Sequence, residues 1–454
     1  MREACGIVGV YNHPEAANLV YLALYALQHR GQESAGIVSC DDNFFFIQRG
    51  MGRVATVFNE EMIKQLPGNI AIGHVRYSTS GESDIIGSQP LLIKYGQGTL
   101  AVAHNGNLIN AEQIRDRLIT NGSIFQTDTD SEVIVHLIAK SKAKTFIDRL
   151  VDSLFKIKGG YSLVFMTDDM MIGMRDPYGL RPLALGKIGD AYILVSETCA
   201  LNLIEAELIR EIEPGEMVII NSSGLTFQKP LPAKKTSFCV FEYIYFARPD
   251  SIVHGQNVHA ARKRFGNQLA KESFIDADLV IPIPDSGTSA AIGFAEESSI
   301  HFDLGMIRNR YVGRTFIEPQ QSIRHFGVKL KLNPNRELIE GKRVIAIDDS
   351  IVRATTSRKI VSMIREAGAK EVHIRVSCPP VCFPCYYGID TPTRAELIAS
   401  THTIDEIRRY IGADSLAYLS LKGMKNALGP MCNKICTACY TGKYPIPFTN
   451  HKDS

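Results

Sequence analysis

The sequence predicts two domains with different sheets: a mixed α+β domain followed by an α/β domain with a parallel sheet. Short apolar segments separated by turn residues dominate the first half, whereas the second half repeats strand–helix–strand units, which are typical of parallel sheets. The chain has 454 residues, which favours two or three domains. The stretch 229–235 (KPLPAKK), which contains two prolines, is the expected boundary.

The first half contains apolar segments of strand length between longer amphipathic stretches. The expected strands are 6–11, 69–73, 100–104, 161–166 and 170–174, and the expected helices are 16–28 and 131–139. The third strand runs into Asn105–Gly106, a pair typical of turns, so we expect the strand to end there. The last two strands flank a Thr-Asp-Asp turn and form a hairpin. Layered sheets with helices outside them fit this order.

In the second half, the apolar residues follow a different periodicity. The expected strands are 278–284, 343–347 and 371–377. The first leads into a helix from Thr288, and the second leads through a polar loop into a helix. Apolar residues at Ile360, Met363 and Ile364 mark the second helix, and Gly368 is its stop signal. Such units place ligands beyond the carboxyl ends of the strands.

The composition excludes several classes of protein. Lys and Arg total 50 and Asp and Glu 48, so the formal net charge of +2 gives no electrostatic footprint for nucleic acid or an anionic membrane. No apolar run approaches the ~18 residues of a membrane span. Residues 1–4 lack the apolar core of a signal peptide. We therefore expect a cytoplasmic globular protein with neither nucleic-acid nor membrane partners.

Ten cysteines are present, and a reducing compartment makes a disulfide framework unlikely for them. Six of them fall between Cys378 and Cys439, and this clustering favours metal or cluster ligation. Cys436 and Cys439 form a pair with two-residue spacing, which alone suits zinc, iron–sulfur or redox chemistry.

Cys5 has an informative position close to the start of the chain. A cysteine that is itself the first residue carries its own base, because its α-amine has a reference pKa of about 7.7–8 and reaches the thiol. Removal of Met1–Ala4 would create this arrangement. The alternative is a small buried cysteine at the start of a strand.

Three further clusters of residues meet the needs of a cysteine that attacks an amide. The Asn105 side-chain amide and the Gly106 N–H could form an oxyanion hole. Arg76 could clamp an α-carboxylate, and Asp130 could pair with an α-ammonium. Together they describe a pocket for glutamine. The plain alternatives are a hairpin turn, a surface arginine and a helix cap.

The stretch 344–357 (VIAIDDSIVRATTS) is the sharpest local signal. An apolar strand ends in Asp348 and Asp349, and the hydroxyl residues Thr355, Thr356 and Ser357 then begin a helix. Backbone amides and hydroxyls at a helix start suit a phosphate monoester. The two carboxylates can accept hydrogen bonds from sugar hydroxyls or help hold hydrated Mg²⁺. The alternative is a solvated Asp-Asp turn with an ordinary helix cap.

This stretch resembles the ribose-phosphate fingerprint of the type I phosphoribosyltransferases. Residues 284–289 (PDSGTS) resemble the loop of that family that holds pyrophosphate, which implies roles for Asp285, Ser286 and Gly287, with Ser286 beside Mg²⁺. The cationic segment 310–331, with Arg314, resembles the mobile loop that closes over the donor and excludes water. Ala354 stands where the family pattern usually has Gly, which implies a small change in contact with the 5′-phosphate.

The first half resembles the N-terminal-nucleophile glutamine amidotransferases. The matching segments, in the family's order, are 5–9 (CGIVG), 27–36 (LQHRGQESAG), the segment around Arg76, 104–106 (HNG) and Asp130. The resemblance implies an αββα fold for this half. Asparagine and glucosamine-6-phosphate synthases share this half but lack the 348–357 stretch.

Both halves together resemble the glutamine phosphoribosyl pyrophosphate amidotransferase family, from residue 5 to about 445. The resemblance implies a propeptide at 1–4, a glutamine amidotransferase domain at 5–232, and a phosphoribosyltransferase domain at 233–454 with a helical, cluster-binding tail. It implies that glutamine, phosphoribosyl pyrophosphate and water give 5-phosphoribosylamine, glutamate and pyrophosphate at the entry to purine synthesis. Ammonia would pass internally between the two sites. A non-catalytic sensor of phosphoribosyl pyrophosphate, or a glutaminase serving another acceptor, stays a rival.

The resemblance also implies cofactors and assembly. Mg²⁺ would lie at Ser286, Asp348 and Asp349. In the cluster-bearing branch of the family, the matching cysteines hold a structural [4Fe–4S] cluster, and they are Cys239, Cys385, Cys436 and Cys439. Zinc is the alternative, and nearby spare cysteines are Cys378, Cys382 and Cys432. Family members form homotetramers, and feedback by purine nucleotides is possible.

Overall fold

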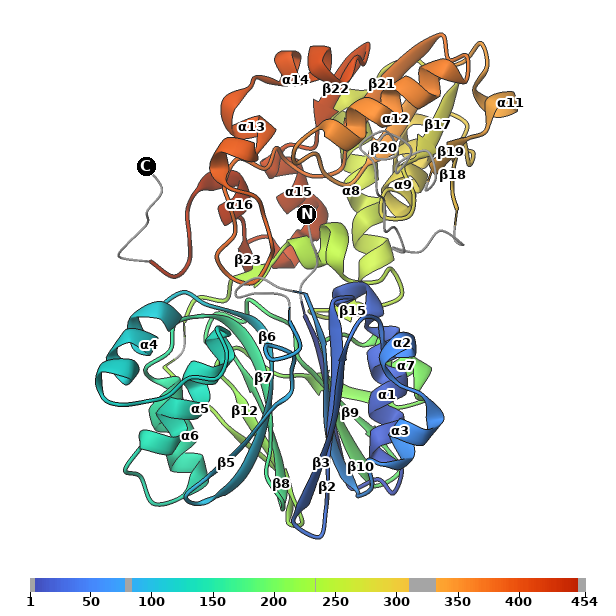
Figure 1. The fold of residues 1–454 in the computed structure, drawn as a ribbon. Coiled ribbons are helices and arrows are strands. Elements are labelled where there is room, and N and C mark those ends of the chain that lie inside the picture. Colours follow the sequence, from blue (N-terminus) through green and yellow to red (C-terminus); the bar gives the residue numbers. More distant parts are fainter. Residues whose placement is uncertain (1–4, 78–83, 233, 310–331, 448–454) are drawn as a thin grey trace.

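The computed structural model describes residues 5–77, 84–232, 234–309 and 332–447. The expected propeptide 1–4 and the expected closing loop 310–331, with Arg314, lie outside these residues. Figure 1 shows two stacked sheets with helices on their outer faces, and a second α/β part above them. Within the described ranges, no helix is long and apolar enough to cross a membrane.

The first sheet is antiparallel and has seven strands in the order β11-β9-β10-β1-β4-β2-β3. Its strands are β1 (Gly6–Tyr11), β2 (Ser34–Asp41), β3 (Phe44–Met51), β4 (Ile70–Arg76), β9 (Ala184–Ile188), β10 (Ala191–Val195) and β11 (Glu207–Glu211). The helices beside it are α1 (Ala16–Ala26), α2 (Val54–Val57), α3 (Glu60–Lys64) and α7 (Cys199–Leu203). The expected helix 16–28 therefore ends two residues early, where a 3₁₀ turn (Gln28–Arg30) replaces it.

The second sheet is antiparallel and has six strands in the order β13-β12-β8-β7-β6-β5. Its strands are β5 (Leu91–Tyr95), β6 (Gly98–Leu108), β7 (Gly159–Met166), β8 (Met170–Arg175), β12 (Met217–Asn221) and β13 (Gly224–Gln228). The helices on its outer face are α4 (Ala111–Thr120), α5 (Asp130–Lys140) and α6 (Phe146–Leu154). Buried side chains from both sheets form the core between them, such as Ile72, Val164 and Leu194. This is the expected αββα arrangement.

One expectation for this half is wrong. Asn105 and Gly106 do not form a turn, because β6 continues through them to Leu108 and pairs with β7. Gly106 has a φ of +150°, and a side chain there would meet the carbonyl oxygen of Gly160 at 2.0 Å. The glycine thus serves close strand approach instead of chain reversal.

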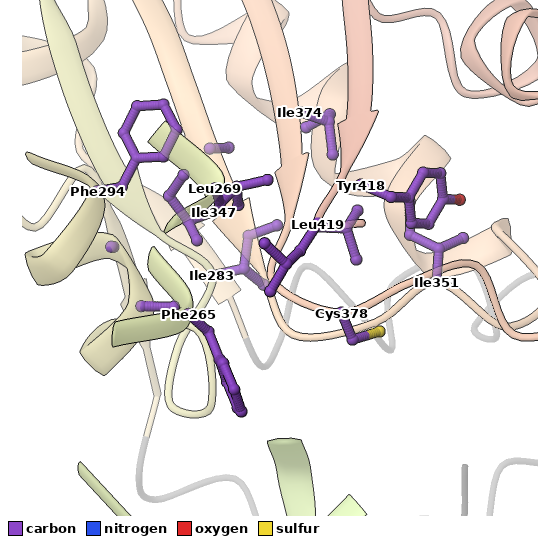
Figure 2. Close-up of a cluster of buried hydrophobic side chains, with 14 of the residues drawn as sticks. Phe265, Leu269, Ile283, Phe294, Ile347, Ile351, Ile374, Cys378, Tyr418 and Leu419 are labelled. Carbon is purple, nitrogen blue, oxygen red and sulfur yellow. The ribbon is translucent and has the colours of Figure 1, made fainter. Parts of the chain in front are cut away.

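The second half has a four-stranded parallel sheet in the order β17-β20-β21-β22. Its strands are β17 (Leu279–Pro282), β20 (Arg343–Asp348), β21 (Glu371–Val376) and β22 (Ser415–Tyr418). The surrounding helices are α8 (Val258–Ser273), α9 (Thr288–Ser298), α12 (Thr355–Glu366), α14 (Ile404–Ile411) and α15 (Leu421–Leu428). Figure 2 shows its core, where Phe294 and Ile347 pack among other buried apolar side chains. The expected α/β arrangement is confirmed.

Shorter elements complete this half. They are β15 (Ile252–Val253), β16 (Gln256–Asn257), β18 (Met306–Arg308), β19 (Leu332–Pro334), α11 (Arg336–Ile339) and α13 (Ile398–Thr401).

Chain segments from both ends of the second half meet near the first half. Strand β14 (Phe238–Cys239) pairs in parallel with β23 (Ile435–Cys436), so the C-terminal tail returns to the start of this half. A π-helical turn (Glu242–Phe246) follows β14, and α16 (Ala438–Thr441) follows β23. The boundary expected at 232/233 falls between β13 and β14 and stays a prediction.

Candidate active sites and the cysteine cavity

A small pocket at the end of the first sheet contains most of the residues predicted to bind glutamine. It is lined by Cys5, Arg76, Tyr77, Gln89, His104, Gly106, Thr129 and Asp130. Cys5 precedes β1 and is buried, and its thiol lies 3.5 Å from the Tyr77 carbonyl oxygen. Burial raises the pKa of the Cys5 thiol, so the thiolate needs a base or a positive charge close by.

The predicted oxyanion donors lie side by side in β6. The Asn105 side chain is fully buried, and its Nδ2 donates to Ser196 Oγ at 3.3 Å. Ser196 Oγ also accepts the backbone N–H of Ile7 at 2.9 Å, which ties Asn105 to β1 and so to the strand that follows Cys5. Ser196 was not predicted, since it lies 91 residues from Asn105 and has no motif of its own.

Asp130 is the first residue of α5 and is held as a carboxylate. Its Oδ2 accepts the Leu108 N–H at 2.8 Å, and its Oδ1 lies 3.5 Å from His104 Nδ1. Burial acts to raise the pKa of Asp130, but His104, the Leu108 N–H and the Ser131 hydroxyl together lower it further, so this pKa lies below its usual value. Arg76, at the end of β4, is also buried in this pocket. A cation and a carboxylate thus lie in one pocket with the thiol.

Gln89 is a pocket residue that sequence reasoning missed. Its Oε1 accepts the His104 backbone N–H at 2.8 Å, and its Nε2 donates to Ser131 Oγ at 3.0 Å. These bonds connect the strand that carries Asn105 to the start of α5. Nothing in the surrounding sequence marks Gln89 as part of a site.

The second candidate site lies at the carboxyl ends of β17 and β20. A Cβ on Gly287 would meet the Ile347 carbonyl oxygen at 2.3 Å, so the glycine lets the 284–289 loop lie against the end of β20. The Ser286 hydroxyl donates to Asp349 Oδ2, and Asp349 N–H donates to Asp348 Oδ1 at 2.9 Å. The topology thus brings the two motifs of this half together, as predicted.

The two aspartates have little access to solvent. Burial, followed by the charge of Asp349, raises the pKa of Asp348 well above its usual range, and burial raises the pKa of Asp349. Adjacent buried carboxylates with a serine hydroxyl form an oxygen-only donor set, which Mg²⁺ prefers. The residues present therefore fit a hydrated Mg²⁺ ion.

Helix α12 begins directly after this turn. Thr355, Thr356 and Ser357 form its first turn, where backbone N–H groups have no partner within the helix. Ala354, the residue before it, has a φ of +58° and is buried. This left-handed conformation costs a non-glycine residue about 1–2 kcal/mol. It explains in physical terms why glycine suits this position.

Asp285 is exposed and forms an ion pair with Arg308. Arg314 is not among the described residues, so its place relative to Asp285 stays a prediction.

Four of seven cysteines, namely Cys239 and the six of the C-terminal region, were predicted as cluster ligands. Cys239, Cys385, Cys436 and Cys439 all line one cavity, together with Leu180, Arg181, Phe241, Tyr387, Ile389, Thr391, Ala438 and Tyr444. Cys378, Cys382 and Cys432 are not among the lining residues. The structure thus brings the four cysteines named by the resemblance together around one cavity.

The chemistry of this cavity suits a thiolate-bound cluster. Burial raises the pKa of Cys436 to about 12 and that of Cys239, Cys385 and Cys439 above the usual thiol value. Thiolates there need a compensating metal charge. Four cysteines around one apolar cavity form the donor set of a [4Fe–4S] cluster. Among the residues described, no group of three or more His, Cys, Asp or Glu side chains is arranged so that it could hold a single metal ion.

The halves are joined by a buried group of charges. Arg30 Nε donates to the Cys5 carbonyl oxygen at 3.1 Å. Its Nη atoms bond to Glu197 at 2.7 Å and to both carboxylate oxygens of Glu242 at 2.8 and 3.0 Å. All of these side chains are buried. Glu242 lies in the π-helical turn three residues after Cys239, so Cys5 of the first half is connected through Arg30 to the second half.

A backbone contact joins the cysteine cavity to β6, the strand that carries the predicted oxyanion donors. Gly388, three residues after Cys385, packs so closely on Gly106 that a Cβ on it would lie 2.8 Å from Gly106 Cα. Next to this contact, Asn107 Nδ2 donates to the Tyr386 carbonyl oxygen at 2.9 Å.

Comparisons with known proteins show the family of this chain. A family model for a glutamine amidotransferase domain matches residues 74–203. Chloroplastic amidophosphoribosyltransferase 2 of Arabidopsis thaliana is 52% identical over 453 residues, which cover 99% of this chain and 81% of the relative. The amidophosphoribosyltransferase of Bacillus subtilis is 50% identical over 451 residues, and the match covers 98% of this chain and 94% of the relative. The chain belongs to the amidophosphoribosyltransferase family.

Relatives reach beyond plants and bacteria. The amidophosphoribosyltransferase of Archaeoglobus fulgidus is 50% identical, and the match covers 97% of this chain and 98% of the relative. The solved structure of the B. subtilis glutamine phosphoribosylpyrophosphate amidotransferase, complexed with ADP and GMP, has a TM-score of 0.93, 50% identity and 97% coverage of both chains. As an amidophosphoribosyltransferase family member, the chain is a glutamine-dependent enzyme of the first step of purine biosynthesis. The predicted family, fold class and enzymatic function are confirmed.

Proposed function

We propose that Cys5, as the N-terminal residue of the mature chain, is the glutaminase nucleophile. Its α-amine would accept the thiol proton, and the thiolate would attack the side-chain amide carbon of glutamine. Asn105 Nδ2 and the Gly106 N–H would stabilise the tetrahedral oxyanion. The leaving amide nitrogen takes a proton and departs as ammonia, and water then releases glutamate from the thioester. The presence of Cys5, Gly106, Arg76 and Asp130 in one pocket carries this proposal.

Arg76 and Asp130 select the substrate in this proposal. The guanidinium binds the α-carboxylate by two parallel hydrogen bonds. Because the pKa of Asp130 lies below its usual value, its carboxylate is charged at neutral pH and pairs with the α-ammonium. An amino acid with a side-chain amide then has its carbonyl carbon directed at the thiol.

The second site would transfer the phosphoribosyl group to this ammonia. Thr355, Thr356 and Ser357 with the α12 amides would bind the 5′-phosphate, and Asp348 and Asp349 the ribose hydroxyls. Asp285, Ser286 and Gly287 would hold pyrophosphate, and Arg314 would belong to the loop that closes over the donor. Ammonia would pass internally to C1 of the sugar, form the C–N bond there and displace pyrophosphate. The contact between the two motifs at Ser286 and Asp349 supports this placement.

Two metal groups fit the residues present. Mg²⁺ would be held by Ser286, Asp348 and Asp349, and when bound it neutralises charge on the pyrophosphate leaving group. A [4Fe–4S] cluster would be held by the four cavity cysteines in a structural role, since neither half-reaction moves electrons. We propose further the domain limits 5–232 and 233–454, a cytoplasmic homotetramer, and feedback by purine nucleotides, which the nucleotide complex of the B. subtilis relative supports.

The maturation step is tested by the intact mass of the purified protein together with its glutaminase activity. We expect a chain that has lost Met1–Ala4, begins at Cys5 and releases glutamate from glutamine. A fully active glutaminase that retains Met1 would contradict the proposal, because Cys5 would then have no α-amine. The variant Cys5→Ala is the matched control, since it should bind glutamine without hydrolysing it.

A further inference from the structure

Arg181 is a fully buried arginine that lines the cysteine cavity. It lies in the segment between β8 and β9 of the first half. The residue before it, Leu180, accepts the Cys239 backbone N–H at 3.2 Å through its carbonyl oxygen. This bond fixes the segment that carries Arg181 against one of the proposed cluster ligands.

The guanidinium of Arg181 has unmet hydrogen-bonding capacity. Its Nη2 lies 3.1 Å from Glu242 Oε1, which makes an ion pair. None of its three side-chain nitrogens, however, forms a hydrogen bond of acceptable geometry with any described residue. Leaving buried charged donors unsatisfied costs several kcal/mol as an order of magnitude, so native proteins rarely do it.

Two other arginines are buried as deeply and are fully satisfied. All three side-chain nitrogens of Arg30 donate to the Cys5 carbonyl or to Glu197 and Glu242. The nitrogens of Arg175 donate to backbone carbonyls at 2.7 to 2.9 Å. Neither of these arginines lines the cysteine cavity. The unmet donors therefore belong to the arginine beside the sulfur atoms.

The charge of Arg181 acts on one side of the cavity. Arg181 lines the cavity together with Cys239 and Cys385, and its guanidinium is close enough to act electrostatically on both side chains. Its positive charge thus favours thiolates at these two positions.

We propose that Arg181 is a cluster-binding residue, in addition to the four cysteines. Its N–H groups donate hydrogen bonds to sulfur atoms on the Cys239–Cys385 side, and its charge offsets part of the negative charge of the thiolate-bound cluster. This inference rests on the proposed [4Fe–4S] cluster. Reduction adds one electron to an already anionic cluster, and hydrogen bonds and net charge near the sulfurs set its potential. Arg181 therefore raises the reduction potential of the cluster.

The test compares four proteins purified anaerobically: the wild type, Arg181→Met, Arg181→Lys and Arg375→Met. The measurements are iron and sulfide per chain, the electron paramagnetic resonance signal of the reduced form, and the one-electron reduction potential. Arg181→Met should shift the reduction equilibrium at least tenfold towards the oxidised form, which is 59 mV for one electron. Arg181→Lys keeps the charge with fewer donors and should show a smaller shift. Arg375→Met removes a buried arginine of β21 that does not line the cavity and should leave the potential and the resonance signal unchanged.

The outcomes separate the two proposals. A correctly folded wild type that contains no iron overturns the cluster itself. The role of Arg181 alone is overturned if the wild type contains a full cluster and both Arg181 variants have the same potential and resonance signal as the wild type. If Arg181→Met does not fold, the Arg181→Lys values decide in the same way. Equal shifts in Arg181→Met and Arg375→Met also contradict the proposal, because they would reflect a general loss of packing.

Discussion

The contact between Gly388 and Gly106 predicts that a change in the cysteine-bearing segment impairs the glutaminase site. In Gly388→Ala, the new methyl group would lie 2.8 Å from Gly106 Cα and 2.9 Å from its carbonyl carbon. Ordinary contact begins near 3.4 Å, so β6 and the Gly388 segment must separate by about 0.6 Å, which displaces Gly106 where β6 yields. Misplacement of about 1 Å can cost ~100-fold in rate, and loss of one oxyanion donor costs ~100- to 1,000-fold. We expect glutamine-dependent kcat to fall roughly 10- to 100-fold.

The assay is pyrophosphate release with glutamine and, separately, with ammonia as nitrogen donor. Ammonia-dependent activity should be preserved, because it bypasses the oxyanion hole. Gly388 has a φ of +102°, so the substitution also strains the backbone. Gly224→Ala is the matched control, since Gly224 has a φ of +100° and no heavy atom of a described residue within 4 Å of its Cβ position. Equal loss of both activities, or a glutamine activity equal to that of Gly224→Ala, would refute the reasoning. The iron content of each protein shows whether Cys385 still holds metal.

Three further predictions concern charged residues. Asp348→Asn combined with Asp349→Asn should abolish pyrophosphate release with either nitrogen donor, and survival of the ammonia reaction would contradict the placement of the second site. Because the pKa of Asp130 is lowered, its carboxylate stays charged below the usual carboxyl pKa, so the KM for glutamine should stay constant from pH 7 to about pH 4. In His104→Asn, which removes one of the partners that lower this pKa, the rise in KM should begin at higher pH, and an unchanged profile would exclude this coupling. Glu242→Gln should lower the free energy of unfolding by about 3–5 kcal/mol in urea denaturation, because Arg30 then loses a buried ionic partner; a loss below about 1 kcal/mol would show that solvent reaches these charges.

Local patterns in the sequence predicted the elements whose residues follow one period. The strand before Asp348 and the helix after Ala354 were predicted because the spacing of apolar residues that marks a strand or a helix can be read from a short stretch of sequence. Asn105–Gly106 was predicted as a turn because the pair favours turns in isolation. Pairing with β7 overrides this preference, since Gly106 at +150° allows close approach to Gly160.

Contacts between distant segments could not be predicted in this way. Arg30 and Glu242 are separated by 212 residues, and only the packing of the two halves brings them together. The same holds for Ser196 beside Asn105 and for Arg181 at the cysteine cavity. These residues have no local pattern, because their roles depend on the unmet charge or hydrogen bond of a partner far along the chain.

The central claim is that Cys5 releases ammonia from glutamine for use at a separate phosphoribosyl site. It is tested most directly by pyrophosphate release from phosphoribosyl pyrophosphate in Cys5→Ser, with glutamine and with ammonia. We predict that the glutamine-supported reaction is lost and that the ammonia-supported reaction continues at the wild-type rate. Survival of both reactions would show that Cys5 is not the nucleophile, and loss of both would show that the two sites do not act separately.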